Sequence, residues 1–485
     1  MTSAKSLLKR SVQFTLALLV SFAAFLVFAV LAARLDSPSD LPQVDNKQGL
    51  LIDSVSIVDV ATGTVVPDQQ LLIRHGLIED IRAANSTAPS NYQLIDGKGA
   101  FVVPGLIDMH THIYDRKDLV TSLAYGVTSV RNLRGLPMHL RWREELQSNT
   151  WLGANLYTSS PVLDRPEHAH LMQQAVSDPQ HARELVRQFH ADGYDLLKIY
   201  NDIEPDILSA IIDEALIQHM PIAKHGPFGA VPASGKEFNL GDIQSMQSLE
   251  HVEEIFQTVL RFNYDTEALQ RYIQKLKQTG SFVTPTLATF DHLTQLSAHK
   301  QAYVKAQPIH RINPFFRFLN EQFAIQRWLQ ADQAQIDWNF KERNILFKIT
   351  QQLAINSVPL LVGSDQGTMY MTAGISTHLE MALMQEAGID PATILRSATL
   401  NAATAMHMEQ TTGSVARNKI ADLALVTANP LTDITHLTKP MAVVKQGQWL
   451  GESALAELIA SGAQPSHWYP SFGRFIEDIV TRSYL

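Results

Sequence analysis

The chain has 485 residues, of which 45% are hydrophobic and 18% charged, with a formal net charge of −9 at pH 7. This length and composition predict a large globular domain with a smaller one and exclude general disorder, and the absence of a basic run excludes a nucleic-acid-binding surface. The chain has no cysteine, which excludes disulfides, thiolate ligands and cysteine nucleophiles, so any metal site must use His, Asp, Glu or a modified Lys.

The N-terminal segment, residues 1–35, combines a basic flank with a hydrophobic run. Lys5, Lys9 and Arg10 precede residues 11–33, which are uncharged and rich in Leu, Val, Phe and Ala. The run is long enough to span a bilayer, and its positive flank should stay in the cytoplasm, so the rest would be exported to a periplasmic or other extracytoplasmic space. A cleaved signal peptide, which would leave a secreted protein, and a buried core helix are alternatives. We favour an uncleaved anchor because signal peptides usually have a shorter apolar region.

Short strand patterns lie on both sides of the central part of the chain. Residues 36–49 contain Ser, Pro, Asp, Gln and Asn and are interpreted as a linker. The segments 50–100 and 415–452 together predict a small composite β-sandwich domain. Residues 453–485 form a C-terminal tail without an assigned role. The expected strands of the small domain are 50–60, 70–75, 77–82, 421–427 and 441–449.

Residues 101–414 alternate between strand and helix patterns. Eight strands separated by helices predict an α/β fold of the (β/α)8 TIM-barrel type. In such a barrel, functional side chains lie at the C-terminal ends of the strands. The expected strands are 101–108, 126–131, 154–159, 194–199, 221–225, 247–251, 281–286 and 359–364, and the expected helices are 179–191, 205–219, 265–278, part of 315–355, and 392–408.

The first expected strand ends in the sequence His-Thr-His. Residues i and i+2 of a strand point to the same side, so His110 and His112 can reach one metal ion from one edge. Two neutral imidazoles can hold a catalytic zinc while leaving a position open for water. The pair alone is a weak signal, because the chain has 18 histidines and His168 and His170 have the same spacing.

Other polar residues occupy the ends of later strands. Lys198 lies in an apolar stretch of the fourth strand, where burial would lower its pKa. Either its amine reaches water from an edge strand, or the neutral amine has captured carbon dioxide to form a carbamate that can bridge two metal ions. His225, His251 and Asp365 end strands five, six and eight. Each alone could be a satisfied polar residue or, for Asp365, a turn former, but their joint placement favours a metal site.

Several short motifs follow one another along the chain. They are Pro-Gly-Leu-Ile-Asp-Met-His-Thr-His at 104–112, Gly-Val-Thr-Ser-Val-Arg at 126–131, Leu-Lys-Ile at 197–199, Glu-His at 250–251, Gly-Ser-Asp-Gln-Gly at 363–367, Ala-Thr-Leu-Asn-Ala-Ala at 398–403 and Lys-Ile-Ala-Asp-Leu-Ala-Leu-Val at 419–426. In this order they resemble the amidohydrolase superfamily, in its metal-dependent branch near imidazolonepropionase and the prolidase-like enzymes. The resemblance covers most of the chain between the N-terminal segment and the C-terminal tail.

The resemblance implies a site for two divalent metal ions, usually zinc, built from the residues at the strand ends. The ligands would be His110, His112, Lys198, His225, His251 and Asp365. The first two histidines and the aspartate would hold the more buried ion, and the other two histidines the more exposed one. The lysine, carboxylated, would bridge both ions. Manganese or cobalt would also suit these ligands.

Such a site implies hydrolysis of a C–N amide bond by metal-activated hydroxide. Asp365 is the expected catalytic residue, which takes the proton of the attacking water and passes it to the leaving amine. Tyr200, His170 and Arg131 are the expected substrate-binding residues, unless these polar side chains only hold one another. The expected substrate is a dipeptide or N-acyl amino acid. Alternatives are a hydrolase of cyclic amides, lactones or phosphoesters, and a membrane-tethered binding protein without activity.

Overall fold

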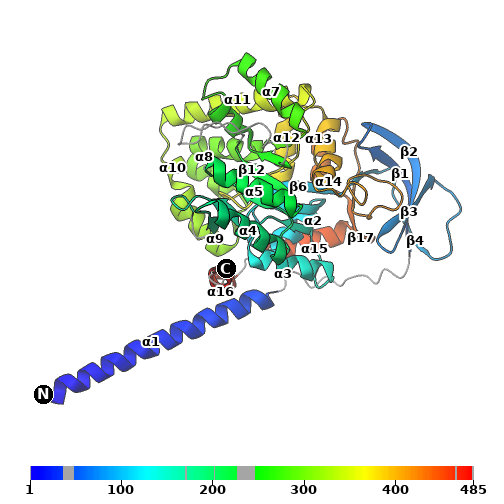
Figure 1. Ribbon diagram of the computed structural model, residues 1–485. Coiled ribbons are helices and arrows are strands. Elements are labelled where there is room, and N and C mark those ends of the chain that lie inside the picture. Colours follow the sequence, from blue (N-terminus) through cyan, green and yellow to red (C-terminus); the bar gives the residue numbers. More distant parts are fainter. Residues whose placement is uncertain are drawn as a thin grey trace.

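The first helix projects from the body of the molecule. The computed structural model describes residues 2–36, 49–169, 172–200, 203–226, 246–464 and 467–482. Helix α1 (Thr2–Leu35) extends away from the folded body, and only its C-terminal end contacts it (Figure 1). The segment Lys9–Leu35, with mean hydropathy 2.8, is long and apolar enough to cross a membrane, and it would equally pass as a signal sequence.

Strands from before and after the central region form one mixed sheet beside it (Figure 1). The alternating apolar residues of these strands pack into a core of their own, which includes Ile52, Leu71 and Val444. Strand β15 pairs with β5, which joins the two ends of the chain. The eight strands are β17 (Gln448–Gly451), β16 (Ala442–Lys445), β15 (Leu423–Val426), β5 (Phe101–Pro104), β1 (Gly49–Asp59), β2 (Thr64–Arg74) and β3 (Leu77–Ala83), with β4 (Tyr92–Asp96) paired to β1.

The expected strand 101–108 is divided between two sheets. Residues 101–104 form β5 of the mixed sheet, whereas β6 (Leu106–Thr111) opens the parallel one. Gly105 lies between them, and a Cβ atom at this position would come within 2.1 Å of Thr128 Oγ1. The chain crosses from one sheet to the next at this position. A glycine suits the crossing because a larger side chain would collide with Thr128 on the neighbouring strand. The small sheet therefore extends beyond the expected boundary at residue 100.

Parallel strands form the centre of the larger part. All of their described pairings are parallel, and single bridges join Ser159 to Leu196, Val283 to Leu360 and Thr111 to Gln366. The expected strand 359–364 takes part only through such bridges. The strands are β6, β7 (Val127–Asn132) and β8 (Asn155–Thr158) in one sheet, and β10 (Gln173–Ala175), β9 (Val162–Asp164), β11 (Leu197–Ile199), β12 (Ile222–His225), β13 (Ser248–Glu250) and β14 (Phe282–Thr284) in the other.

Helices surround the parallel strands (Figure 1). Their apolar faces pack on the strands in the main core, where Trp142 and Leu346 are fully buried. The expected helices 179–191, 205–219 and 265–278 are present as α4, α5 and α7. The helices of this layer are α2 (Arg116–Ala124), α3 (Pro137–Gln147), α4 (Pro179–Asp192), α5 (Pro205–Ile217), α6 (Val252–Glu254), α7 (Thr266–Thr279), α8 (Leu287–Ala306), α9 (Pro314–Leu319), α10 (Gln326–Leu329), α11 (Gln333–Ile355), α12 (Ile375–Glu386), α13 (Pro391–Ser397) and α14 (Leu400–Ala405).

The long helix expected within 315–355 is present as α11, which Asp332 caps by accepting a hydrogen bond from Gln335 N. The earlier part of this region contains α9, a π-helical turn at Asn320–Ala324 and α10. The region 392–408 is divided into α13 and α14. The tail contains α15 (Glu452–Ala463), which packs on α2, and α16 (Trp468–Arg482), which packs on α1.

Candidate metal centre

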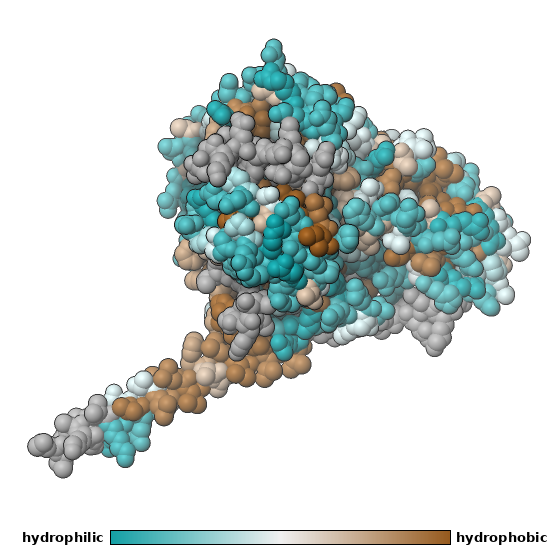
Figure 2. Space-filling model, in the orientation of Figure 1, coloured by the Kyte–Doolittle hydropathy of each residue, from teal (hydrophilic) through white to brown (hydrophobic). Residues whose placement is uncertain are grey.

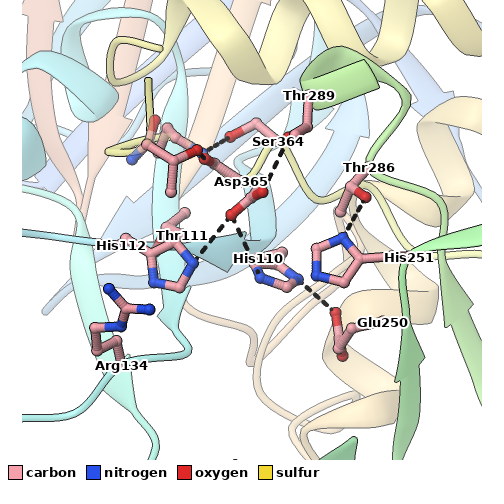
Figure 3. A network of polar contacts seen from close by, with 12 residues as sticks. His110, Thr111, His112, Arg134, Glu250, His251, Thr286, Thr289, Ser364 and Asp365 are labelled. Carbon is pink, nitrogen blue, oxygen red and sulfur yellow. Dashed lines mark hydrogen bonds and ion pairs between the residues drawn. The ribbon is translucent and has the colours of Figure 1, made fainter. Parts of the chain in front are cut away.

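Two histidines and an aspartate meet at the end of β6. His110 in β6 and His112, which directly follows this strand, both point towards Asp365, which lies after the bridged residue Leu360 (Figure 3). His112 Nε2 lies 3.0 Å and His110 Nε2 lies 3.6 Å from Asp365 Oδ1. The three residues are buried, and one potential ligand atom from each lies within 4.8 Å of the others. This geometry suits a cation held by two imidazoles and a carboxylate.

Hydrogen bonds hold Asp365 in an unusual backbone conformation. Its φ is +56°, in the left-handed region that aspartate tolerates better than most residues. Its backbone N–H donates to His110 O at 2.7 Å, and Thr289 Oγ1 donates to its Oδ2 at 3.0 Å. Burial opposes ionisation of the carboxyl group, but His112 and His110 together hold its pKa well below the usual range. Asp365 is therefore a carboxylate fixed on both sides.

Two further histidines extend the cluster. The ring of His251 lies 4.6 Å from that of His110 and 4.4 Å from that of His225. His251 Nδ1 lies 2.7 Å from Thr286 Oγ1, and His225 Nε2 lies 3.0 Å from a Glu254 carboxylate oxygen. Strands β6 and β12 and the residue after β13 thus bring the four predicted histidines together.

Burial disfavours the charged form of three imidazoles of this cluster. Burial lowers the pKa of His112 to about 4, and it also lowers the pKa values of His225 and His251. An imidazole must be neutral to give a ring nitrogen to a cation, so this environment favours metal binding over protonation.

Lys198 lies inside β11 with 1% of its surface exposed. Its Nζ has no hydrogen-bond partner among the described residues. Burial lowers the pKa of the amine to about 8, although Glu250 opposes the shift. A buried amine that is partly neutral and lacks a partner fits the expected carbamate, because a carboxylated amine would carry the charge and the acceptor oxygens that a metal pair requires.

Arg131 lies next to this cluster and pairs with Glu250. Its side chain is fully buried and donates to Met109 O, Ser248 Oγ and Glu250 Oε1, at 2.7, 2.9 and 2.8 Å. This placement differs from the expected substrate-binding role, because β7 turns the guanidinium into the interior. Glu250 in turn lies 2.8 Å from His110 Nδ1 and orients that ring.

Replacing Arg131 with Ala is expected to lower the free energy of unfolding by about 3–5 kcal/mol, because it leaves the fully buried Glu250 carboxylate without its cation. Urea denaturation of the two proteins measures the loss. The matched control is Arg183→Ala, which breaks a surface ion pair to Asp213 and should cost less than about 1 kcal/mol. Equal losses in the two variants would contradict the role assigned to Arg131.

A different arginine faces the site. Figure 3 shows the guanidinium of Arg134 directed towards His112. It donates to Tyr114 Oη at 3.1 Å and to the predicted Tyr200 at 3.3 Å. No carboxylate lies within ion-pair distance of it among the described residues. His170, the third expected substrate-binding residue, lies outside the described residues.

Sequence reasoning did not assign several residues that support the ligands. Glu250, Glu254, Thr286 and Thr289 contact His110, His225, His251 and Asp365 respectively. A signal was available for Glu250, which is a carboxylate directly before a candidate ligand. The threonines gave none, since hydroxyl residues are common after strands.

The chain was compared with known proteins. Residues 101–450 match the Amidohydrolase family. Among curated relatives, a dihydroorotase of Pelobacter propionicus is 36% identical over 64 residues, which are 13% of this chain and 15% of that enzyme. Adenine deaminase 2 of Agrobacterium fabrum is 32% identical over 136 residues, covering 25% of this chain and 22% of that enzyme. The chain therefore aligns with less than a quarter of either relative.

Solved structures match over much more of the chain. Bottromycin amidohydrolase superposes with a TM-score of 0.69 and 25% identity, covering 90% of this chain and 95% of its own. A Xaa-Pro dipeptidase with bound methionine has a TM-score of 0.63 and 19% identity over 83% of this chain and 100% of its own, a likeness of fold. The family match covers well over half of the chain and confirms the resemblance seen in its motifs, so this protein belongs to the amidohydrolase family.

Proposed function

We propose that this protein is a membrane-anchored, binuclear metal-dependent amidohydrolase that cleaves the C–N amide bond of a dipeptide or N-acyl amino acid. The observation that carries the proposal is the buried amine of Lys198, which lacks a hydrogen-bond partner among the described residues and lies in the same cluster as the four histidines and Asp365. The parallel strands and their bridges support a closed eight-stranded barrel as the scaffold. The helix α1 supports an anchor that leaves the catalytic part on the exported side.

The residues present fit a pair of divalent cations, with zinc as the expected metal. His110, His112 and Asp365 would hold one ion, His225 and His251 the other, and carboxylated Lys198 both. When bound, the ions would lower the pKa of a water molecule and polarise the scissile carbonyl. Glu250 fixes the ring of His110, and Thr286 fixes that of His251, so that the ring nitrogens that face the site stay in place.

Asp365 acts as the general base and then as the general acid of the reaction. Its carboxylate accepts a proton from the attacking water and returns it to the nitrogen of the leaving amine. The hydrogen bond from Thr289 holds Oδ2, which leaves Oδ1 on the side of the two histidines. One residue thereby serves both proton transfers without moving its backbone.

Arg134 is the proposed anchor for the carboxylate of the substrate. Its half-buried guanidinium has no carboxylate partner among the described residues, and a bound carboxylate would supply one. Tyr200 and Tyr114 hold the guanidinium from two sides and leave it directed to His112. A dipeptide or N-acyl amino acid supplies such a carboxylate next to the scissile amide.

Replacing Arg134 with Met should raise KM for an N-acyl amino acid by roughly 10- to 100-fold, the effect of losing a charge-assisted hydrogen bond. The same substrate with its carboxyl group amidated provides the control, since it lacks the partner of Arg134. Steady-state kinetics on both substrates test the assignment. A rise in KM of equal size for both substrates would show that Arg134 only shapes the site.

Elemental analysis of the purified full-length protein, paired with a substrate screen, tests the proposal as a whole. We expect about two metal ions per chain and turnover of dipeptides or N-acyl amino acids that ceases on chelation. The screen includes cyclic amides, lactones and phosphoesters, and turnover of only one of these would move the protein to that substrate class. Zero or one metal per chain would overturn the bridged site, and two metals without turnover of any substrate would favour a binding protein.

A further inference from the structure

The C-terminal helix α16 has the polarity of a membrane-facing helix. Its polar side chains point inward: Ser471, Arg474, Glu477 and Asp478 are at most 3% exposed. Its apolar side chains point outward, and Trp468 is 48% exposed, while Phe472, Phe475, Ile476 and Ile479 are only partly covered. A helix on the surface of a water-soluble protein shows the reverse arrangement. The outer face of α16 is therefore better matched to an apolar environment than to water.

Ion pairs hold the polar face of α16 against the rest of the chain. Arg474 pairs with Asp115 at 2.5 Å and with Asp36 at 2.5 Å. Glu477 pairs with Arg34 at 3.0 Å and with Arg141 at 2.5 Å. These contacts reach the end of α1 and the start of the helical layer around the parallel strands, so α16 is fixed between the two.

Close packing also joins α16 to α1. The rings of Phe472 and Phe25 lie 6.2 Å apart, and those of Tyr469 and Phe28 lie 5.4 Å apart. A Cβ atom at Gly473 would come within 2.0 Å of Ala29 O, so this glycine permits the close approach. At 1.5 Å per residue, Phe25 lies about 15 Å along the helix from Leu35. If α1 spans a hydrocarbon core of about 30 Å, α16 lies at the depth of its outer half.

The apolar surface continues onto the neighbouring helix α9. Trp468 and Phe472 pack on Phe315, with ring centroids 6.0 and 5.5 Å away. Phe318, one helical turn along α9, is 49% exposed, and Phe323 in the following turn is 77% exposed. Figure 2 shows hydrophobic surface along α1 up to the point where this helix meets the body.

We propose that α16 is a second membrane-bound element, which lies in the outer leaflet against α1 with its apolar face in contact with lipid. Phe318 and Phe323 extend this contact, so the catalytic part rests on the bilayer instead of moving on a free tether. The proposal requires α1 to remain in the membrane, and it is independent of the substrate. The occupant of the surface is lipid, because the surface is continuous with α1 and lies at bilayer depth.

Spin labels at single cysteines test this contact in the full-length protein. The chain has no native cysteine, so each label reports one position. We choose Trp468→Cys and Phe323→Cys as test positions, Leu19→Cys in α1 as the lipid reference, and Leu94→Cys on β4, which is 60% exposed and distant from α1, as the water reference. The protein is placed in nanodiscs of phosphatidylethanolamine and phosphatidylglycerol, and power saturation compares collisions with oxygen and with a water-soluble nickel chelate.

We expect the labels at 468 and 323 to resemble the label at 19, with an oxygen-to-nickel collision ratio several-fold above that at 94. Labels at 468 and 323 that match position 94, while position 19 is in lipid, would overturn the contact of α16 and leave the anchor intact. A label at 19 exposed to nickel would overturn both. Labels at 468 and 323 protected from oxygen and nickel alike would assign the surface to a second copy of the chain and also reject the proposal.

Discussion

Asp365→Asn is expected to lower kcat by about 10³-fold, because asparagine cannot accept the proton of the attacking water or return it to the leaving amine. The side-chain oxygen of asparagine keeps a metal ligand in place, so metal content should stay near that of the parent protein. Turnover of the best substrate in the screen and elemental analysis of the same preparation measure the two quantities.

Turnover and metal content together distinguish a loss of proton transfer from a loss of metal binding. Asp213→Asn is the matched control, since this aspartate pairs with Arg183 on the surface and should leave both readouts unchanged. Unchanged turnover in Asp365→Asn would exclude the proton-transfer role. A parallel loss of metal and turnover would instead reduce Asp365 to a ligand.

Lys198→Ala is expected to remove bound metal and to abolish measurable turnover. Carboxylated Lys198 would be the ligand shared by both ions. Without it, His110, His112 and Asp365 would remain for one ion and His225 and His251 for the other, and the two cations would repel each other across a buried site. Elemental analysis should fall from about two ions per chain to one or fewer.

A second variant shows whether the amine or the cavity is responsible. Lys198→Met keeps the apolar volume of the side chain and removes only the nitrogen, so it should fold with the thermal stability of the parent protein or better. It should lose metal to the same extent as Lys198→Ala. Metal retained in the methionine variant and lost in the alanine variant would attribute the loss to the cavity and reject the carbamate.

The ligands could be predicted because each stands out against its local sequence. His110 and His112 have the spacing of one face of a strand, and Lys198 interrupts an apolar strand where a charged amine is unfavourable. The structure adds two facts that spacing cannot give. The Lys198 amine lacks a hydrogen-bond partner among the described residues, and the rings of His225 and His251 lie against each other.

The choice between the arginines could not be made from the sequence. Every residue of β7 is buried, so neither alternation nor hydropathy tells which of its side chains point towards the metal centre and which point away from it. Arg131 lies within β7 and forms an ion pair with Glu250, whereas Arg134 lies after β7 and its guanidinium faces His112. Which way each arginine side chain points depends on the register of β7, and this register is set by pairing with the neighbouring strands.

The tail escaped assignment for a different reason. Arg474, Glu477 and Asp478 lie on one face of α16, and a face of this kind usually marks the side of a helix that contacts water. Here that face is buried against α1 and the body by ion pairs. Hydrophobic patterning gives the period of a helix but assigns its inner face only when the surrounding solvent is known.

The pairing of Arg34 with Glu477 joins residues 443 positions apart in the chain. Helix α1 is therefore synthesised long before α16. The side of α1 around Ala29, which Gly473 approaches closely, can be covered by α16 only after the domain between the two helices has been synthesised. Closing so long a loop depends on the intervening domain having folded, which brings the two helices together. Docking of α16 on α1 is thus a late step of assembly.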